Sequence, residues 1–449
     1  MRHRKSIVVV GGNAAGAAAA AKAKRTSPES DVWLIEKGNY ISTGTCEIPY
    51  AISGEISDYK KLIFYTPESF LNEKKVNVRT GHIVNSIDRK NKSLQVKDIA
   101  DSRTFNVEYD KLILATGSVV NPLFEEPQPI NYFEIKTITD LEKTLSYLEK
   151  NHIGTAIIFG AGYVGLEVAE AFTKRGLKVK VIERSPALLN DSEPEIRSAV
   201  ENDLKLHDID FYSSATNYQF RTNSGRIGAV VIGSLVLEGD LFINCTGFKP
   251  NTALAVAAGL KTGNSGAIIV NNYLQTSDPD IYAAGDCIEV TDFITNNKVN
   301  LHLASLAHDQ GHLAGFNSVS IQKSVYKKVV KSISFRLFNC FYSHCGLTEE
   351  EALADGFPAT PVTEVLPNLV KVMPESSTTF AKIVYDRSSK QILGASFRGG
   401  KEVSGYCDLI SFLIRNRLPV TKLSETDFNY TPALSPFRNI LSVLSRKVK

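Results

Sequence analysis

The feature of this sequence that most constrains its fold is a glycine-rich turn between a short apolar run and a helix-forming segment. Residues 156–159 have the composition of a buried strand, and Gly160, Gly162 and Gly165 follow with the spacing Gly-x-Gly-x-x-Gly. In that spacing the first glycine permits a tight turn, the second lets the backbone approach a pyrophosphate, and the third lets helix and strand pack closely. The segment therefore predicts a dinucleotide-binding unit on a parallel sheet.

The end of the next predicted strand indicates which dinucleotide this unit binds. Residues 179–182 are followed by Glu183, at a position where a carboxylate binds free ribose hydroxyls. A carboxylate there disfavours a 2′-phosphate, so the sequence favours NADH. Arg184, the next residue, could accommodate NADPH, and this alternative stays open.

A second unit of the same kind begins the chain. Residues 7–10 form a β-branched run that passes into the turn Gly11–Gly16 and then into an alanine-rich helix. Asn13 stands in place of the second fingerprint glycine. A further predicted strand, residues 32–35, ends in Glu36, where an acid can accept hydrogen bonds from a ribose. We interpret the combination as a second dinucleotide site; the alternative is a glycine-rich turn that binds nothing.

Three later segments end predicted strands in turns of small residues. They are residues 109–118, which contain Thr116 and Gly117, residues 242–251, which contain Gly247, and residues 276–287, which contain Gly285 and Asp286. A carboxylate at a strand end, such as that of Asp286, can bind the hydroxyl of a polyol. The alternative for each segment is a plain strand-end turn.

A single cysteine lies between the two units, in the stretch Ile41–Tyr50. Pro49 fits the first turn of a helix that starts just after Cys46, and a helix N-terminus favours a thiolate. Glu47 acts the other way, because a neighbouring negative charge disfavours a second one. Ile41 stands where a partner cysteine could have stood, so the thiolate would cycle through a mixed disulfide, a persulfide or a sulfenic acid. The alternative is a small buried hydrophobe.

Size and composition exclude several classes. A chain of 449 residues predicts two to four domains, and a net charge of +3 gives no field for nucleic acid. No run of about eighteen apolar residues occurs, so we expect no membrane span. Six scattered cysteines form neither a disulfide scaffold nor a zinc pattern, so we expect no metal and a cytoplasmic location.

The last third of the chain lacks such fingerprints. Residues 333–338 alternate like a strand, and residues 348–352 have the composition of a helix start. Cys340 and Cys345 are separated like the cysteines of dithiol reductases, but two strand positions five apart point to opposite faces. We therefore interpret this pair as structural.

The turn Gly11–Gly16, Glu36, the turn at residues 115–117 and the segment Ile281–Asp286 recur in this order in the two-dinucleotide flavoproteins, and the chain resembles the pyridine nucleotide-disulfide oxidoreductases. The resemblance implies an α/β fold with two Rossmann-like domains, for FAD and NAD(P)H, and a C-terminal α+β dimerisation domain. It places the FAD domain at residues 1–118 and 250–322, the NAD(P)H domain at 119–249 and the dimerisation domain at 326–449. A homodimer is implied.

The resemblance also assigns the cofactor-binding residues. Those expected to bind the two dinucleotides are Gly11, Gly12, Asn13, Ala14, Ala15, Gly16, Glu36, Lys37, Thr116, Gly117, Gly285, Asp286, Gly160, Gly162, Tyr163, Val164, Gly165, Glu167, Glu183 and Gly247. Tyr163 resembles a family tyrosine that covers the flavin until nicotinamide displaces it. The alternative for Tyr163 is a stacking residue in a contact between domains.

The stretch Cys46–Tyr50 resembles the Cys-Gly-Leu-Pro-Tyr of the single-cysteine branch, with Glu47 as a departure. That branch includes coenzyme A-disulfide reductases, persulfide and polysulfide reductases, NADH oxidases and NADH peroxidases. Its oxidases and peroxidases carry a histidine where this chain has Ala14, which argues against a peroxidase. Carried over from the coenzyme A-disulfide reductases, the substrate-binding residues are Arg25, Ser42, Thr45, Lys74 and Arg438. Thr45 replaces an asparagine, and Arg438 replaces a lysine.

Two tyrosines of the branch complete its active site from the C-terminal part of the chain. Tyr430 occupies the place of the one that reaches the partner subunit's flavin and cysteine, whereas residues 372–374 read Val-Met-Pro where the family has Tyr-Tyr-Pro. We therefore expect an FAD-dependent NAD(P)H oxidoreductase that reduces a disulfide, persulfide or polysulfide, with Cys46 and Tyr430 as catalytic residues. The alternatives are an NADH oxidase that uses a cysteine sulfenic acid and an electron-transfer flavoprotein reductase.

Overall fold

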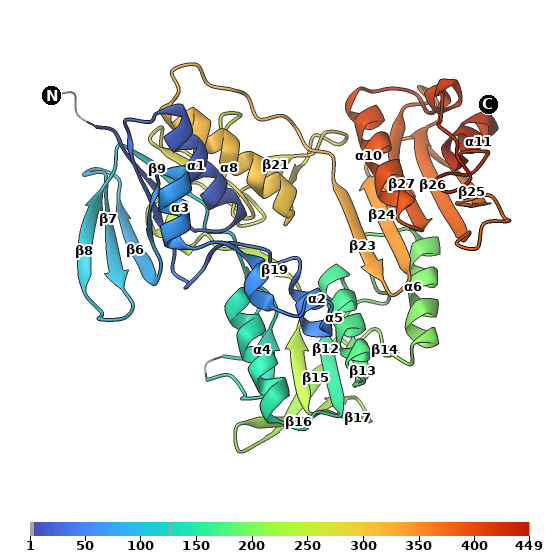
Figure 1. Cartoon of the computed structure of the whole chain (residues 1–449), viewed down its shortest axis with the longest axis horizontal. Coiled ribbons are helices and arrows are strands. Elements are labelled where there is room, and N and C mark those ends of the chain that lie inside the picture. Colours follow the sequence, from blue (N-terminus) through green and yellow to red (C-terminus); the bar gives the residue numbers. More distant parts are fainter. Residues whose placement is uncertain (1–3, 126, 449) are drawn as a thin grey trace.

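The computed structural model describes residues 4–125 and 127–448, and the chain forms three bodies (Figure 1). The first body contains a parallel sheet of strand order β20-β9-β1-β2-β5. Its strands are β1 (Ser6–Val10), β2 (Asp31–Ile35), β5 (Asn77–Arg79), β9 (Lys111–Leu114) and β20 (Ile281–Ala283). The central strand β1 is buried from Ile7 to Val10, as expected of a parallel strand covered on both faces.

Two helices far apart in sequence pack on this sheet and against each other. They are α1 (Ala14–Thr26) and α8 (Ala304–Val319), which lie side by side in Figure 1. A Cβ atom added at Gly311 would lie 2.0 Å from the backbone oxygen of Ala15, and one at Gly315 would lie 2.2 Å from that of Ala19. The alanines of α1 and the glycines of α8 therefore allow the two backbones to approach closely.

The rest of the first body surrounds the cysteine segment and the sheet edge. Pro49 lies in the first turn of α2, which confirms the predicted helix start after Cys46. The elements are β3 (Ile41–Thr43), α2 (Ile48–Ser53), η1 (Tyr59–Leu62), β4 (Ile63–Tyr65), α3 (Pro67–Lys74), β6 (His82–Asp88), β7 (Ser93–Asp98), β8 (Thr104–Glu108), α7 (Ala253–Ala257), β21 (Val290–Thr291) and β22 (Lys298–Val299).

The second body contains another parallel sheet, of order β11-β18-β12-β13-β14. Its strands are β11 (Tyr132–Glu134), β12 (Thr155–Phe159), β13 (Lys178–Ile182), β14 (Asp210–Tyr212) and β18 (Leu241–Asn244), and its helices are α4 (Ile138–Lys150), α5 (Tyr163–Lys174) and α6 (Pro194–Leu206). A small antiparallel sheet adds β15 (Tyr218–Asn223), β16 (Arg226–Ile232) and β17 (Leu235–Glu238). The pair β10 (Ser118–Val120) and β19 (Phe248–Pro250) joins this body to the first.

The third body is an antiparallel sheet with helices. Its strand order is β23-β24-β27-β26-β25, with β23 (Ser332–Leu337), β24 (Cys340–Gly346), β25 (Ala359–Pro367), β26 (Thr378–Asp386) and β27 (Ile392–Gly399). Its helices are α9 (Glu349–Ala354), α10 (Glu402–Arg415), η2 (Val420–Glu425) and α11 (Ile440–Lys447). The predicted strand at 333–338 and helix start at 348–352 are confirmed. Cys345 is buried and Cys340 half-buried, and both are free thiols.

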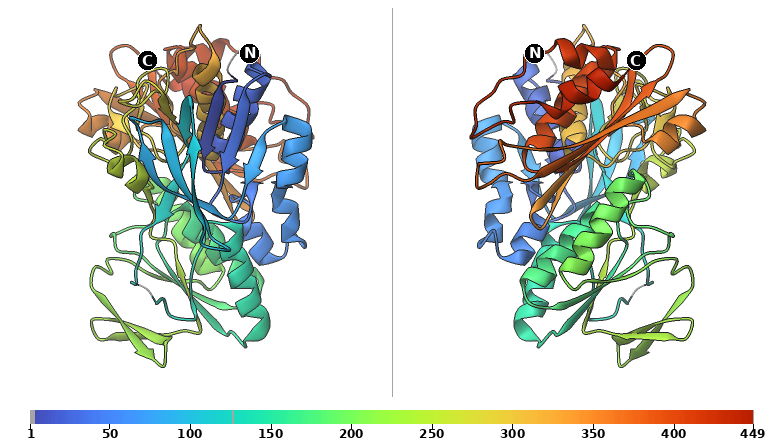
Figure 2. Two further views of the ribbon diagram at one scale, coloured as in Figure 1. Left: turned by 90° about the vertical axis from the view of Figure 1, so that its left-hand side faces the viewer. Right: turned by 90° about the vertical axis from the view of Figure 1, so that its right-hand side faces the viewer.

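Ion pairs join the second body to the third. The buried Lys382 on β26 lies 2.8 Å from Glu193 just before α6, and Arg398 on β27 lies 3.2 Å from Asp203 on α6. Within the third body, Lys382 also lies 2.9 Å from Glu349 on α9. Figure 2 shows α6, in green, running beneath the orange strands of the third body. The predicted α/β class, with two Rossmann-like parallel sheets and a C-terminal α+β body, is confirmed.

Within residues 4–125 and 127–448, none of the helices has the length and hydropathy needed to span a bilayer.

Candidate active site

The first glycine turn forms the floor of the N-terminal site. A Cβ atom at Gly11, which has φ +103°, would lie 2.1 Å from the oxygen of Ala115, and one at Gly16 would lie 1.7 Å from the oxygen of Gly11. Within the described residues, neither a capping side chain nor an acidic residue occupies the start of α1. The backbone N–H groups of that first turn are thus left for an anion such as a pyrophosphate.

Glu36 closes the same turn from β2. Its carboxylate accepts hydrogen bonds from the backbone N–H of Gly12 and of Gly38, both at 2.6 Å. Ala14 and Ala15 form the first residues of α1, and Lys37 is exposed beside Glu36. The structure therefore brings together the predicted residues of the first turn, and their role in binding FAD stays a prediction.

Asn13, which replaces the second fingerprint glycine, has a specific contact. Its side-chain oxygen accepts a hydrogen bond from the backbone N–H of Thr43 at 3.0 Å, and the N–H of Ser42 donates to Gly12 at 2.8 Å. Ser42 adopts a left-handed φ of 49°, which is costly for a residue with a side chain. Asn13 thus ties the nucleotide turn to β3, the strand that leads to Cys46.

Cys46 lies on the loop between β3 and α2. The residue is exposed, but surrounding protein atoms desolvate its sulfur, and this partial burial is the largest cause that raises the pKa of the thiol. Glu47 raises it next, then Glu167 and Asp286, whereas Lys136 lowers it. Acidic charge therefore outweighs basic charge around the predicted nucleophile.

A polar cluster that the sequence did not reveal lies beside Asp286. Lys136 donates to the hydroxyl of Ser118 at 2.7 Å, lies 3.9 Å from the Asp286 carboxylate and sits 4.3 Å from the centre of the Phe248 ring. Burial lowers the pKa of Lys136, and it also lowers that of His302 nearby. Both residues come from segments without a motif, so no local signal could have found them.

The other predicted strand-end turns converge on this site. The Thr116 hydroxyl donates to the backbone oxygen of Asn251 at 2.6 Å, and the backbone N–H of Gly285 donates to the side chain of Gln310 on α8 at 2.8 Å. Gly117 has φ +67°, so it holds a turn that favours glycine. The turns after β9 and β20 are thus fixed by contacts with later segments of the chain.

A cavity of about 1150 Å³ lies at the second glycine turn. Its wall includes Gly160, Glu183, Arg184 and Gly247. Glu183 accepts hydrogen bonds from the backbone N–H of Ala161 and of Ser185, both at 2.8 Å, which is the arrangement of Glu36 in the first turn. In the described chain the start of α5 also lacks a capping side chain and an acidic residue. This cavity lies at the turn where the nicotinamide dinucleotide is predicted to bind, and the role of its lining residues stays a prediction.

Tyr163 lies in a contact between bodies. Its ring packs edge-on against Phe335 of β23 at 5.2 Å between ring centres, and its hydroxyl lies 3.4 Å from the Asp191 carboxylate. Burial, followed by the charge of Asp191, raises the pKa of Tyr163. Val164 and Gly165 continue α5 from this residue. Tyr163 thus lies in a contact between domains, as its alternative interpretation expected, but edge-on to Phe335; its flavin-covering role stays a prediction.

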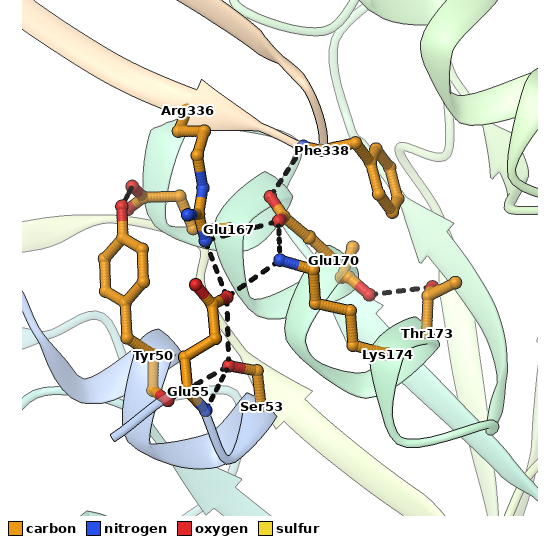
Figure 3. Close-up of polar contacts among 10 residues, drawn as sticks. Tyr50, Ser53, Glu55, Glu167, Glu170, Thr173, Lys174, Arg336 and Phe338 are labelled. Atoms are coloured by element: carbon orange, nitrogen blue, oxygen red, sulfur yellow. Dashed lines mark hydrogen bonds and ion pairs between the residues drawn. The ribbon is translucent and has the colours of Figure 1, made fainter.

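Glu167 faces the helix that follows Cys46. Figure 3 shows the Tyr50 hydroxyl pointing at its carboxylate, 3.4 Å away. Burial raises the pKa of Glu167 to about 7, although the hydrogen bond from Tyr50 acts in the opposite direction. A carboxyl group that is half protonated near neutral pH therefore lies behind the cysteine loop.

Arg336 of β23 joins all three bodies at this point. Its guanidinium lies 4.8 Å from the centre of the Tyr50 ring, 2.6 Å from Glu55 and 3.5 Å from Glu170. Figure 3 draws the two ion pairs. Lys174 completes the cluster with contacts of 2.5 Å to Glu170 and 2.8 Å to Glu55. The cysteine helix is thereby held against the second and third bodies by charge as well as by packing.

The predicted substrate residues fall into two groups. Ser42 and Thr45 flank the cysteine loop, Arg25 lies 3.2 Å from His312 of α8, and Lys74 sits 4.9 Å from the centre of the Tyr65 ring. Tyr430 and Arg438 instead lie in the tail of the third body, where the exposed Tyr430 contacts Phe437. The basic residues of α1 and α3 thus belong to the same body as Cys46, and the two tail residues belong to another.

Comparisons with known proteins decide the family. A family model described as pyridine nucleotide-disulphide oxidoreductase matches residues 5–311, and one described as the dimerisation domain of these enzymes matches residues 335–439. The chain belongs to the pyridine nucleotide-disulphide oxidoreductases. The resemblance inferred from the sequence is confirmed.

Individual proteins resemble the chain over nearly its whole length. It is 30% identical over 438 residues to a protein named NADH oxidase from Methanocaldococcus jannaschii, with 97% of each chain covered. It is 30% identical over 448 residues to the CoA-dependent NAD(P)H sulfur oxidoreductase of Pyrococcus abyssi, covering 99% of this chain and 98% of that one. The solved NAD-dependent persulfide reductase from A. fulgidus superposes with a TM-score of 0.93 at 28% identity, covering 98% of this chain and 82% of that chain.

Family membership makes the chain an oxidoreductase whose cofactors are FAD and a nicotinamide dinucleotide. The residues present fit both groups, because each glycine turn leaves no room for a Cβ at its first glycine and each is followed by an uncapped helix within the described residues. The matched dimerisation domain supports a homodimer.

Proposed function

We propose that this enzyme uses NAD(P)H to reduce a disulfide, persulfide or polysulfide through Cys46, with coenzyme A as the candidate carrier of the sulfur. The observation that carries the proposal is the place of Cys46. It is a solitary cysteine on a loop tied by Asn13 to the first nucleotide turn. The names of the relatives from Pyrococcus abyssi and A. fulgidus point to the same sulfur chemistry.

In the proposed reaction the Cys46 thiolate attacks one sulfur of the substrate, the S–S bond breaks, and the second half leaves as a thiolate that takes up a proton. The resulting mixed disulfide on Cys46 takes up two electrons and one proton from solvent, which restores the Cys46 thiolate and releases the first half as a second thiol. FAD, when bound, supplies those electrons from the nicotinamide. Tyr430 of the partner subunit is proposed to protonate the leaving thiolate.

Substrate binding is proposed to depend on the two groups of basic and hydroxyl residues. Arg25, Ser42, Thr45 and Lys74 lie in the body that carries Cys46, and Arg438 would reach the same site from the partner, as Tyr430 would. Arg25 and Lys74 offer donors for the phosphates of a coenzyme A nucleotide. In the proposed homodimer, these two groups of residues meet at one site. The proposed domain boundaries are those given in the sequence analysis. The six cysteines are free thiols, which suits the reducing environment of a cytoplasm.

The cofactor roles follow the two turns. The residues from Gly11 to Gly16, Glu36, Lys37, Thr116, Gly117, Gly285 and Asp286 are proposed to bind FAD. Glu183 is proposed to select NADH through the free ribose hydroxyl, with Gly160, Gly162, Gly165, Val164 and Gly247 lining the dinucleotide. Glu167 and Tyr163 would lie near the point where the two cofactors meet.

Replacing the nucleophile tests the proposal. We expect Cys46→Ser to abolish NADH oxidation that depends on added coenzyme A disulfide, while bleaching of the flavin absorbance by NADH persists under anaerobic conditions. Mass spectrometry of the purified protein should show an adduct on Cys46 that reductant removes. Unchanged disulfide-dependent turnover in the variant would contradict a role for this cysteine.

The second candidate is an NADH oxidase with Cys46 as a sulfenic acid, which the name of the Methanocaldococcus jannaschii relative favours. The two functions differ in air without any disulfide. A reductase consumes NADH slowly under those conditions, whereas an oxidase turns over rapidly and forms water or peroxide. An oxygen electrode with NADH alone therefore separates them.

A further inference from the structure

Glu47, the residue after Cys46, holds its carboxylate over the cysteine loop. A Cβ atom added at Gly44 would lie 2.6 Å from the Oε2 atom of Glu47 and 3.0 Å from the ring edge of Phe64. Gly44 therefore leaves the space that this carboxylate fills. The negative charge lies against the loop Gly44–Cys46, at the start of α2.

The charge of Glu47 is not compensated. Across residues 4–125 and 127–448, its carboxylate has no hydrogen-bond or ion-pair partner. Lys136, the cation whose charge lowers the pKa of the Cys46 thiol, already donates to Ser118 at 2.7 Å and lies 3.9 Å from Asp286. An approaching substrate therefore meets the field of Glu47 with little opposing charge.

The helix after Cys46 does not offset this field. α2 has only six residues, and Glu47 stands at its N-cap position in a helical conformation, with φ −86° and ψ −3°. A carboxylate there neutralises the positive end of the helix, which would otherwise favour an anion at Cys46. Partial burial and then Glu47 raise the pKa of the Cys46 thiol, in agreement with an environment that disfavours negative sulfur.

We propose that Glu47 makes Cys46 select sulfur substrates that are uncharged at the reacting sulfur, so that its acceptor is an organic disulfide and neither a persulfide anion nor inorganic polysulfide. This inference rests on the proposed function and narrows its substrate class. An organic disulfide brings no charge to the reacting atoms, whereas persulfides and polysulfides are anionic at the terminal sulfur near neutral pH. Glu47 takes no part in the bond changes and acts through the potential at Cys46.

Phosphate groups on the carrier do not conflict with this selection. In coenzyme A disulfide the phosphates are separated from the sulfurs by the whole pantetheine arm. The proposed phosphate-binding residues Arg25 and Lys74 lie on α1 and α3, outside the cysteine loop. The carboxylate thus acts on the charge at the reacting sulfur.

A charge series of small disulfides tests the selection by turnover. The substrates are cystamine, bis(2-hydroxyethyl) disulfide and dithiodiglycolate, which carry two positive, no and two negative charges around the same S–S bond. We expect the wild type to show the highest kcat/KM with cystamine and the lowest with dithiodiglycolate. Glu47→Gln should raise kcat/KM for dithiodiglycolate, relative to kcat/KM for bis(2-hydroxyethyl) disulfide, about tenfold, because one nearby unit charge is removed. Glu47→Asp should keep the wild-type ratio.

Alkylation of Cys46 provides a readout that does not depend on turnover. Iodoacetate and iodoacetamide have similar size but differ by one negative charge. Peptide-level mass spectrometry measures the rate at Cys46 with each reagent, and Glu47→Gln should raise the iodoacetate-to-iodoacetamide ratio about tenfold. Glu47→Asp should leave that ratio unchanged.

The outcomes separate the two proposals. If the wild type reduces disulfides through Cys46 but Glu47→Gln changes neither ratio, the selection by Glu47 is overturned and the reductase function stands. If inorganic polysulfide is the best substrate of the wild type, the narrowed substrate class is overturned as well. If no disulfide or polysulfide supports Cys46-dependent NADH oxidation, both proposals fail.

Discussion

Replacing Glu167 by glutamine should stabilise the protein at alkaline pH and leave it nearly unchanged at acidic pH. Burial raises the pKa of Glu167 from 4.5 to about 7, so the folded protein resists ionising this carboxyl group. A glutamine has nearly the same shape as the protonated acid and does not ionise. It can still accept the hydrogen bond from Tyr50 that Figure 3 shows.

The size of the effect follows from the shift. The folded-state pKa lies above the unfolded value, so wild-type stability is complete below pH 4.5 and is lost as pH rises through 7. With 1.36 kcal/mol for each pKa unit, the advantage of Glu167→Gln grows by about 2.5 kcal/mol between pH 5 and pH 8. That corresponds to a difference in Tm of roughly 5 to 10 °C for a cooperative unit of 150–250 residues.

The assay is thermal unfolding of the FAD-bound protein at several pH values between 5 and 8, with wild type and variant in parallel. Glu55→Gln, in the same cluster, is the matched control. The Arg336 hydrogen bond lowers the pKa of Glu55 to about 2, so its folded and unfolded values both lie below pH 5. Glu55→Gln should therefore be less stable than wild type by an amount that does not vary over this range.

A Tm difference between Glu167→Gln and wild type that is the same at pH 5 and pH 8 would refute the reasoning. It would mean that Glu167 ionises at its ordinary pKa in the folded protein. If the Tm difference between Glu55→Gln and wild type also grew from pH 5 to pH 8, the pH dependence would belong to the whole cluster and not to Glu167.

Three further changes test the architecture and the second site. Gly311→Val should prevent the close approach of α8 to α1, since even a Cβ would lie 2.0 Å from the backbone oxygen of Ala15. We expect the variant to be purified without FAD or to be insoluble. Lys382→Met leaves the buried Glu193 without its cation and should cost about 3 to 5 kcal/mol by chemical denaturation, with partial recovery at low pH because burial raises the pKa of Glu193. Glu183→Gln should raise the KM for NADH about tenfold and reduce the preference of the enzyme for NADH over NADPH, measured as the ratio of the two steady-state KM values.

Much of the framework could be predicted because it depends on local backbone chemistry. Gly11 and Gly160 both have φ near +100° and both lie against a backbone oxygen, a combination that glycine alone tolerates. Pro49 predicted the start of α2, and the alternation of side chains at residues 333–338 predicted β23. These signals are contained in a few consecutive residues, so they can be read before the chain folds.

The candidate site was only partly predictable, since many of its contacts join distant segments. The roles of Asn13 and Glu47 depend on where their side chains point, toward Thr43 and over Gly44. Lys136 lies 3.9 Å from Asp286, which is 150 residues away in sequence, and no local pattern at either residue predicts that contact.

By itself, then, the sequence determined two dinucleotide turns, a solitary cysteine between them, and a strand and a helix start in a C-terminal part without such turns, because short-range sterics and periodic burial specify such elements. Tertiary structure alone decided which distant charges join Glu47 around Cys46, where Tyr163 packs and why the pKa of Glu167 is raised. Those properties depend on desolvation and on distances between atoms more than 100 residues apart, such as Tyr50 and Glu167. Only the packed arrangement of the three bodies sets them.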